Sequence, residues 1–267
     1  MTPPSLQVFA CVRDADREIL AQNLHRSPDI AAGRVACDIL WNTRSAATAY
    51  NAALDTRAQA DVIVFTHSDV YFPAGWFDGL ARALAALPED WAIAGLIGRD
   101  AAGAYVGRIW DVGINRMIGS ALPAPAPVVA IDEFVLILRR GSGLRFDEGV
   151  PDFHCYGADL IFEAERRGLG TYVLDRPVIH NSKPIGRLPE SFFDAYRYVR
   201  DKWRDRLPRH GIVVDLRPGP WMLWFRALRI RYKGTLRRST LNFARLQDPS
   251  LKARDLGLEP PPEASAA

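Results

Sequence analysis

The sequence predicts an α/β protein in which helices cover a mainly parallel β-sheet. Short apolar runs at residues 6–12, 35–41, 62–65 and 91–97 are typical of buried strands. Patterns of helical period separate these runs, and parallel neighbours in a sheet need such crossovers. The chain has 267 residues, 48% hydrophobic and 24% charged, which is enough for one large domain with an appendage.

Each of the first two strands leads into a helix. After the first strand, Ile19 and Leu24 belong to an apolar pattern on one helical face. After the second strand, Asn42 and Ser45 supply side-chain oxygens suited to the start of a helix. These segments therefore form two βα units.

The third strand, residues 62–65, is followed by two side chains with metal or proton chemistry, His67 and Asp69. Ligands of α/β sheets bind beyond the carboxyl ends of the strands, so both side chains are well placed for function. The alternative is that Asp69 caps the next helix and His67 is an ordinary surface group. Beyond Pro73, residues 76–87 show helical spacing.

The middle of the chain is less regular. Residues 98–127 are rich in Gly, Ala and Pro, and we expect a long surface excursion that shapes a binding cleft. Residues 128–138 are predicted as a strand that contains Asp132 and Glu133. Two adjacent acids in an apolar strand are costly unless one of them faces a polar cleft.

Regular structure resumes after a polar and aromatic loop at residues 146–157. We expect a helix at residues 158–167 with Gly168 as its C-cap, and extended segments at residues 171–174 and 178–180. A further amphipathic helix carries the apolar residues Phe192, Tyr196, Val199 and Trp203.

The character of the chain changes near Pro218. We assign residues 1–217 to the α/β domain, 218–258 to a helical, basic and aromatic appendage, and 259–267 to a disordered tail. Between residues 226 and 254, nine basic residues accompany a single acid, Asp248. A solvated helix face is one interpretation of this segment and contact with anionic lipid headgroups is another, whereas nucleic acid is not expected as a partner.

The cellular setting is predicted from what the sequence lacks. The three cysteines have no paired spacing, which is typical of reduced thiols rather than of disulfides or a zinc site. We expect no secretory signal, and no apolar run reaches the roughly 20 residues that span a bilayer. A cytoplasmic protein is predicted, with peripheral attachment to the inner face of the membrane left open.

Several short motifs between Gln7 and Ser182 occur in an informative order. They comprise Asn42, Ser45, Tyr50 and Asn51, then residues 67–73, then Asp159 and Leu160 with Gly168, and finally residues 178–180. In this order they resemble the inverting family-2 type glycosyltransferases of GT-A fold. The sequence His-x-Asp-Val-Tyr-Phe-Pro at residues 67–73 is most similar to the streptomycin-biosynthesis StrF-like glycosyltransferase domain.

The resemblance implies transfer of a sugar from a nucleotide-diphosphate donor to an acceptor hydroxyl with inversion, in glycan or polysaccharide biosynthesis. Such enzymes use a DxD triplet at the end of a central strand to hold the donor ribose and a divalent metal. By this resemblance Asp69 is a metal ligand and His180 completes the site. His67 stands where an acid is usual, which favours either Mn²⁺ over Mg²⁺ or a site that is occupied only when the donor is bound.

The resemblance also implies contacts to the nucleotide. Arg13, Asp14 and Asp16 occupy the place where such enzymes contact the base and ribose. Arg44 lies at a predicted helix N-terminus, where backbone N–H groups favour phosphate. Solvated turn residues and helix capping explain the same residues equally well.

The catalytic base departs from the family pattern. Family-2 enzymes usually present Glu-Asp-x-Asp-Leu, but the first two positions here are Tyr156 and Gly157. The base is then expected to be Asp159, with Asp152 and His154 in the preceding loop as alternatives. Helix capping or loop hydrogen bonding accounts for each of these residues as well.

For the acceptor, a glycan or a lipid-linked molecule, the resemblance implies that Asp132 and Glu133 bind sugar hydroxyls. Trp110 and Tyr105 either stack on a sugar face or pack in the core. Two other functions stay open: a metal-dependent hydrolase that uses the two histidines and Asp69, and a sugar-nucleotide binding module without catalysis.

Overall fold

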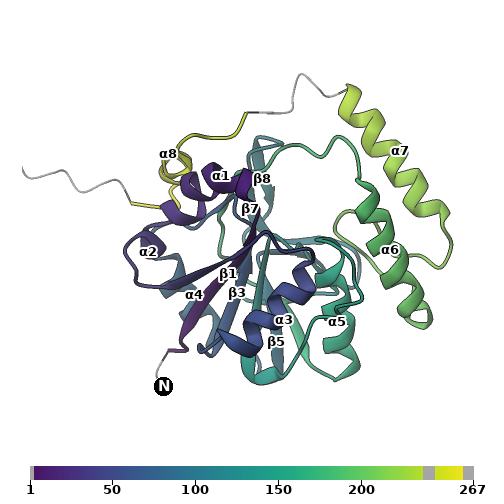
Figure 1. Cartoon of the computed structure of the whole chain (residues 1–267), viewed down its shortest axis with the longest axis horizontal. Coiled ribbons are helices and arrows are strands. Elements are labelled where there is room, and N and C mark those ends of the chain that lie inside the picture. The colour runs from purple at the N-terminus through teal and green to yellow at the C-terminus, as the bar shows by residue number, and fades with distance from the viewer. Residues whose placement is uncertain (1–2, 237–243, 261–267) are drawn as a thin grey trace, which may run out of the picture.

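A computed structural model describes residues 3–236 and 244–260 of the chain. A seven-stranded sheet forms the centre, with the strand order β2-β1-β3-β11-β5-β12-β9, and helices pack on both of its faces (Figure 1). The strands are β1 (Leu6–Val12), β2 (Ala36–Trp41), β3 (Val62–Thr66), β5 (Trp91–Gly95), β9 (Ala126–Pro127), β11 (Val135–Arg139) and β12 (Gly170–Val173).

The sheet is mixed, as predicted for this fold class. Strand β1 pairs in parallel with both β2 and β3, whereas β11 runs antiparallel to its neighbours β3 and β5. Helices provide the parallel crossovers, because the chain must return to the same end of the sheet before each parallel strand. They are α1 (Arg17–Gln22), α2 (Pro28–Ala31), α3 (Ala46–Thr56) and α4 (Trp76–Leu84). Helix α5 (Tyr156–Arg166) lies between β11 and β12, which run in opposite directions.

Strand β3 is buried over its whole length because both of its faces are covered. Val62 and Val64 point into one core with Trp76 of α4, and Ile63 and Phe65 into a second core on the opposite face. Side chains alternate between the two faces of a strand, so a continuous apolar run is what such a strand requires. This burial fixes the position of His67 and Asp69 just beyond the strand.

A second sheet lies where the sequence predicted an irregular excursion at residues 98–127, so that prediction was wrong. Its order is β10-β6-β7-β13-β4, with β8 on the other edge of β7. The strands are β4 (Val70–Tyr71), β6 (Ile97–Arg99), β7 (Tyr105–Asp111), β8 (Arg116–Gly119), β10 (Ala130–Ile131) and β13 (Ile179–His180). All of them except β7 have two to four residues. The seven-residue β7 begins with the exposed Tyr105 and then mixes buried and half-buried residues, which masks the apolar signal.

The predicted continuous strand at residues 128–138 is also corrected. The chain leaves the second sheet after β10 and enters the central sheet at β11, and Asp132 and Glu133 lie in the break between them. The two acids are therefore not part of a strand. The break allows both carboxyl groups to point away from the apolar faces that surround them.

The C-terminal part folds back onto the α/β domain. Helix α7 (Trp221–Leu236) lies beside α6 (Glu190–Lys202), where the rings of Phe193 and Trp224 are 5.9 Å apart. Helix α8 (Pro249–Asp255) packs at the other side of the molecule, near α1 (Figure 1). Within the described ranges, no helix is long and apolar enough to cross a membrane.

The predicted tail at residues 259–267 lies mostly outside the described residues. Of this range the structure describes Glu259 and Pro260, and the Glu259 carboxylate accepts a hydrogen bond of 2.7 Å from the Tyr71 hydroxyl. The 3-10 helices in the described parts of the chain are Asp14–Asp16, Leu24–Arg26, Arg140–Ser142 and Arg204–Arg206.

Candidate functional site

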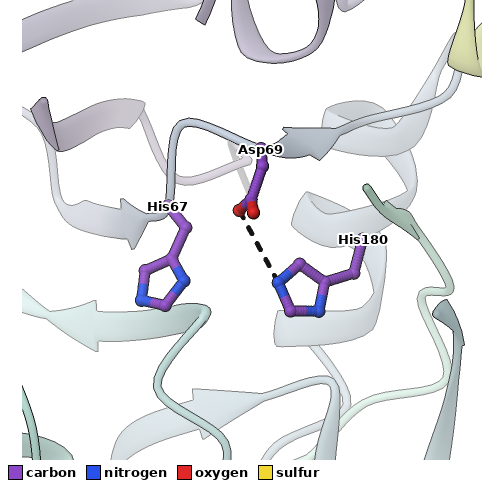
Figure 2. Close-up of side chains that lie close together, drawn as sticks. All are labelled: His67, Asp69 and His180. Carbon is purple, nitrogen blue, oxygen red and sulfur yellow. Dashed lines mark ion pairs between the residues drawn. The ribbon is translucent and has the colours of Figure 1, made fainter. Parts of the chain in front are cut away.

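Strands that are distant in sequence bring three side chains together. His67 and Asp69 follow β3, and His180 is the last residue of β13. Strand β13 pairs with β4 so that His180 lies opposite Val70, next to Asp69. Figure 2 shows the three side chains converging from these elements.

The geometry of this group suits a metal ion. One ligand atom from each of His67, Asp69 and His180 lies within 4.8 Å of the other two. The ligands of one ion lie about 2.1 Å from it and hence no more than roughly 4 Å apart, so shifts of a few tenths of an ångström would close the site. Two imidazoles and one carboxylate form a donor set that first-row transition metals accept well.

An unsatisfied buried atom supports the same conclusion. Oδ1 of Asp69 is buried and makes no hydrogen bond to any residue that the structure describes. It lies 3.6 Å from Nε2 of His180, which is too long for a hydrogen bond. Buried polar atoms are rarely left without a partner, and an ion between the two groups would supply one.

The charges of the group are set by its neighbours. Burial lowers the pKa of His67 to about 4, so this imidazole is neutral at pH 7. Burial alone would lower the pKa of His180 as well, but the carboxylates of Asp69 and Asp111 raise it to about 10. Burial opposes ionisation of Asp69, yet the adjacent His180 charge brings its pKa well below the usual range.

Asp111 belongs to this site although the sequence did not single it out. It ends β7, and the parallel pairing of β13 with β7 places it opposite His180. Its carboxylate lies 3.2 Å from Nδ1 of His180 and accepts hydrogen bonds of 3.0 Å from the Ser182 hydroxyl. A carboxylate on Nδ1 orients the ring and leaves Nε2 free as a metal ligand.

A cavity of about 220 Å³ opens beside the group at the carboxyl ends of the strands. Its walls include Arg13, Asp16, Thr43, Phe153 and Arg245, together with His67, Ser68 and Asp69. Arg13 and Asp16 thus line the same cavity as the histidine and aspartate that follow β3. Their contacts to a nucleotide stay a prediction. Thr43 lines the cavity at the start of α3, where Arg44 is exposed.

Asp14 is held at the rim instead. Its carboxylate accepts hydrogen bonds from Arg17 and Asn42, and these bonds lower its pKa. Asn42 in turn accepts a bond from the backbone N–H of Asp14. The two residues connect the turn after β1 with the turn after β2. These bonds are consistent with the alternative that Asp14 is a turn residue.

The three candidate bases differ in surroundings. Asp159 is buried within α5, and its carboxylate accepts hydrogen bonds from Lys202 and from the Trp203 indole, 3.0 and 2.6 Å long. Asp152 is exposed in a turn with φ of +57°. His154 is half-buried with its ring 5.5 Å from that of Phe192, and burial lowers its pKa, so the imidazole is neutral at pH 7.

Asp132 and Glu133 line a second cavity of about 90 Å³ with Cys155, Phe192 and His210 among its walls. Glu133 is buried and accepts hydrogen bonds from the backbone N–H groups of Cys155 and Gly157 at the start of α5. Burial raises its pKa to about 8. Glu133 therefore occupies the helix start at which the family pattern would place its own acids.

The two aromatic residues proposed for sugar stacking have other contacts. The ring of Trp110 lies beneath the Lys252 ammonium of α8 at 5.0 Å and packs against the buried cluster that includes Tyr71 and Ile179. Tyr105 lies beneath Arg99, and its hydroxyl donates to the carbonyl of Ile212. Trp110 therefore packs as the alternative from the sequence expected, whereas Tyr105 is exposed and does not lie in the core.

With this geometry in place, the fold can be compared with solved structures. GalNAc-T7 bound to UDP, GalNAc and Mn²⁺ matches with a TM-score of 0.51 at 11% identity, over 76% of this chain and 49% of that one. The chain has the GT-A glycosyltransferase fold. The mannosyltransferase PcManGT from Pyrobaculum calidifontis, solved with GDP-Man and Mn²⁺, gives a TM-score of 0.47 at 14% identity, over 97% and 81% of the two chains.

The sequence comparisons do not extend the conclusion drawn from the fold. No known protein-family model matches the chain. A curated relative named "ATP synthase subunits region ORF 6", from Fuscovulum blasticum, is 30% identical over 162 residues, or 57% of this chain. The chain spans 63% of that relative and about half of GalNAc-T7, so neither comparison extends to a whole protein.

Proposed function

We propose that the chain transfers a sugar from a nucleoside-diphosphate donor to an acceptor hydroxyl, with inversion at the anomeric carbon. The observation that carries this proposal is the His67, Asp69 and His180 group, which borders a cavity at the strand ends of a GT-A fold. This is the edge of an α/β sheet where ligands bind. The StrF-like subfamily and a role in polysaccharide biosynthesis are parts of the same proposal.

The metal is proposed to be Mn²⁺ in preference to Mg²⁺. Two imidazoles and one carboxylate offer fewer hard oxygen ligands than Mg²⁺ requires. When bound, the ion stabilises the negative charge that develops on the leaving diphosphate. Asp111 holds the His180 ring for this purpose, and His67 is already in the neutral form that binds metals.

For the donor, the cavity walls suggest the residues that hold the nucleotide. Arg13 and Asp16 are proposed to contact the nucleoside, with Asp14 fixing the turn that carries them. Arg44, exposed at the start of α3, is proposed to reach the phosphates from outside the cavity.

For proton transfer we favour His154 among the predicted bases. Burial lowers its pKa, so it is neutral at pH 7, and it directly follows Phe153, which lines the donor-side cavity. Asp152 lies two residues away and raises the pKa of His154, so it acts through the imidazole. Asp159 is less suited, because Lys202 and Trp203 already occupy its carboxylate. Asp132 and Glu133 are proposed to bind acceptor hydroxyls in the second cavity.

Calorimetric titration with UDP-, GDP- and dTDP-sugars, with and without Mn²⁺, tests the proposal. We expect one donor to bind only in the presence of Mn²⁺, and a product assay with sugar acceptors to show transfer. Release of free sugar regardless of the acceptor would instead indicate a metal-dependent hydrolase. Donor binding without any product would indicate a binding module.

The exposed side chains of helix α7 suggest that the enzyme binds to a surface. Trp221, Phe225, Leu228 and Tyr232 recur at spacings of four, three and four, so they share one face, and all four side chains are exposed. Leu223, on the opposite side of the helix, packs against the core. The helix is thus apolar on two opposite faces, and the described residues of the chain cover one of them.

The charges next to the exposed face match an anionic membrane surface. Arg229 and Arg231 flank the apolar stripe, and the helix contains no acidic residue. Helices that lie in the bilayer interface combine aromatic and aliphatic residues with flanking basic ones. We propose that α7 docks the enzyme on the cytoplasmic face of an anionic membrane, where a lipid-linked acceptor would be within reach.

Flotation with vesicles tests this docking. We expect binding to vesicles that contain phosphatidylglycerol and none to pure phosphatidylcholine. Leu228→Ser should reduce binding several-fold, whereas Leu251→Ser, which changes an equally exposed leucine on α8, should not. Equal loss in both variants would contradict the proposal, as would a stable dimer that buries α7 and ignores the vesicles.

A further inference from the structure

A residue from the C-terminal part of the chain reaches into the proposed donor site. Nη1 of Arg245 lies 2.8 Å from Oδ2 of Asp69, and the same nitrogen donates to the backbone carbonyl of Asn181. Arg245 also lines the cavity beside Arg13 and Ser68. The two residues of this ion pair are 176 positions apart in the sequence.

Hydrogen bonds and an ion pair of the neighbouring residues hold Arg245 in position. The buried side chain of Asn181 accepts a hydrogen bond of 2.8 Å from the N–H of Leu246 and donates one of 2.9 Å to its carbonyl. Two residues later, Asp248 pairs with Arg26 at 2.8 Å and caps helix α8 through the Ser250 N–H. Asn181 directly follows His180, so the same strand end holds both the metal-competent histidine and the arginine.

The arginine occupies one side of a carboxylate that a metal would also use. Oδ2 of Asp69 faces Arg245, whereas Oδ1 faces His180 and has no hydrogen-bond partner in the described parts of the chain. A guanidinium and a divalent cation on one carboxylate repel each other at short range in a poorly solvated site. Arg245 and the ion therefore compete for Asp69.

Once released from Asp69, the guanidinium remains in the cavity because Leu246 stays clamped to Asn181. The planar fork of arginine matches the oxygen geometry of phosphate groups. Nε of Arg245 is buried without a hydrogen-bond partner among the described residues, so its N–H group is available to donate to a ligand.

We propose that Arg245 holds Asp69 when no ion is bound and moves to the diphosphate of the nucleotide when the ion takes its place. The inference rests on the proposed function for the identity of the nucleotide. Arg245 then has two opposing effects: it weakens binding of the ion and strengthens binding of the nucleotide.

Titration of wild type and Arg245→Gln with MnCl₂ and then with UDP and GDP tests the inference. Without nucleotide, the variant should bind Mn²⁺ more tightly by about tenfold, because a charged competitor is removed. At saturating Mn²⁺ it should bind the preferred nucleotide about tenfold more weakly. Arg245→Lys, which keeps the charge but loses the fork, should resemble wild type for Mn²⁺ and the glutamine variant for the nucleotide.

The matched control is Arg26→Gln. It removes an ion pair to the same C-terminal segment at Asp248 without touching the cavity, so both affinities should stay near the wild-type values. Thermal unfolding of each variant shows whether the fold is retained. A structural role alone would weaken both binding steps together, and that result would overturn the inference, as would unchanged Mn²⁺ affinity in Arg245→Gln.

The outcomes separate this inference from the proposed function. If wild type binds Mn²⁺ but neither UDP nor GDP, the diphosphate role of Arg245 is wrong. If the two opposing shifts are found but no sugar is transferred to any acceptor, glycosyl transfer is contradicted and the role of Arg245 is supported.

Discussion

Nδ1 of His180 lies 3.2 Å from the carboxylate of Asp111, at the point where β13 and β7 run in parallel. The contact fixes which ring nitrogen of His180 faces Asp69. Asp111 is therefore a positioning residue for the metal-competent group, and it comes from a segment in which the sequence predicted no regular structure.

Replacement of Asp111 tests this role. Asp111→Asn should weaken Mn²⁺ binding by about 10- to 100-fold, the range found when a partner of a ligating histidine is lost. The fold should persist, because the Ser182 hydroxyl can still donate to the new side chain. Calorimetric titration with MnCl₂ measures the effect, and an unchanged affinity would show that Asp111 does not orient His180.

Removal of the carboxylate ligand should have a larger effect. Asp69→Asn is expected to reduce Mn²⁺ affinity by more than about 100-fold, since a ligand contributes more than its supporting partner. Asp16→Asn serves as a control, because Asp16 lines the same cavity outside the metal-competent group. Equal losses in the two variants would indicate a general effect of negative charge instead of a defined site.

The pairing of His180 predicts a pH dependence of stability in metal-free protein. Its pKa rises from 6.5 to about 10 on folding, so the folded state binds the extra proton between these values. The stabilisation is fully present below about pH 6.5 and is lost as the pH rises towards 10, at about 1.4 kcal/mol per pKa unit as an upper bound.

Urea unfolding of wild type and His180→Asn in a chelating buffer measures this dependence. The difference in free energy of unfolding between the two proteins should shrink steadily from pH 6.5 to pH 10. A constant difference over this range would mean that His180 is neutral in the folded protein.

Gly157 is predicted to be required for space. A Cβ atom there would lie 2.8 Å from Cγ of Glu133 and would push its carboxylate away from the start of α5. Gly157→Ala should lower the free energy of unfolding by about 1–3 kcal/mol through overpacking and lost hydrogen bonds. Gly141→Ala is the control, because a Cβ atom at that position meets no atom within 4 Å. Equal stability of both variants in urea would refute the prediction.

The sequence predicted β3 and β5 of the central sheet well because these strands are continuous apolar runs, whereas β9 lies in the segment where an irregular excursion was expected. Strand β3 illustrates this, since burial on both faces leaves no ambiguity about its extent. The second sheet was missed because five of its six strands have only two to four residues, because β7 is only partly buried, and because β13 pairs with β7 across a long sequence separation. Asp132 and Glu133 were placed in a strand because an apolar run on both sides concealed the break between β10 and β11.

For the candidate site, the order of the motifs suggested that His67, Asp69 and His180 would meet, and the structure brings them together. Their roles stay predictions. Asp111 and Arg245 could not be predicted, because each depends on a pairing that no local pattern encodes. The contact of Glu133 with the start of α5 could not be predicted for the same reason, because Glu133 belongs to a different segment of the chain.

The clamp between Asn181 and Leu246 has a practical consequence. A protein shortened at residue 217, the predicted end of the α/β domain, would lose the guanidinium beside Asp69 and the helix that covers Trp110. Such a fragment would retain the three metal-competent side chains and yet differ from the intact chain in its affinity for cations. Proteolytic clipping between α7 and α8 would produce the same altered behaviour if the released segment left its place, so the integrity of purified protein should be checked by mass before any metal titration.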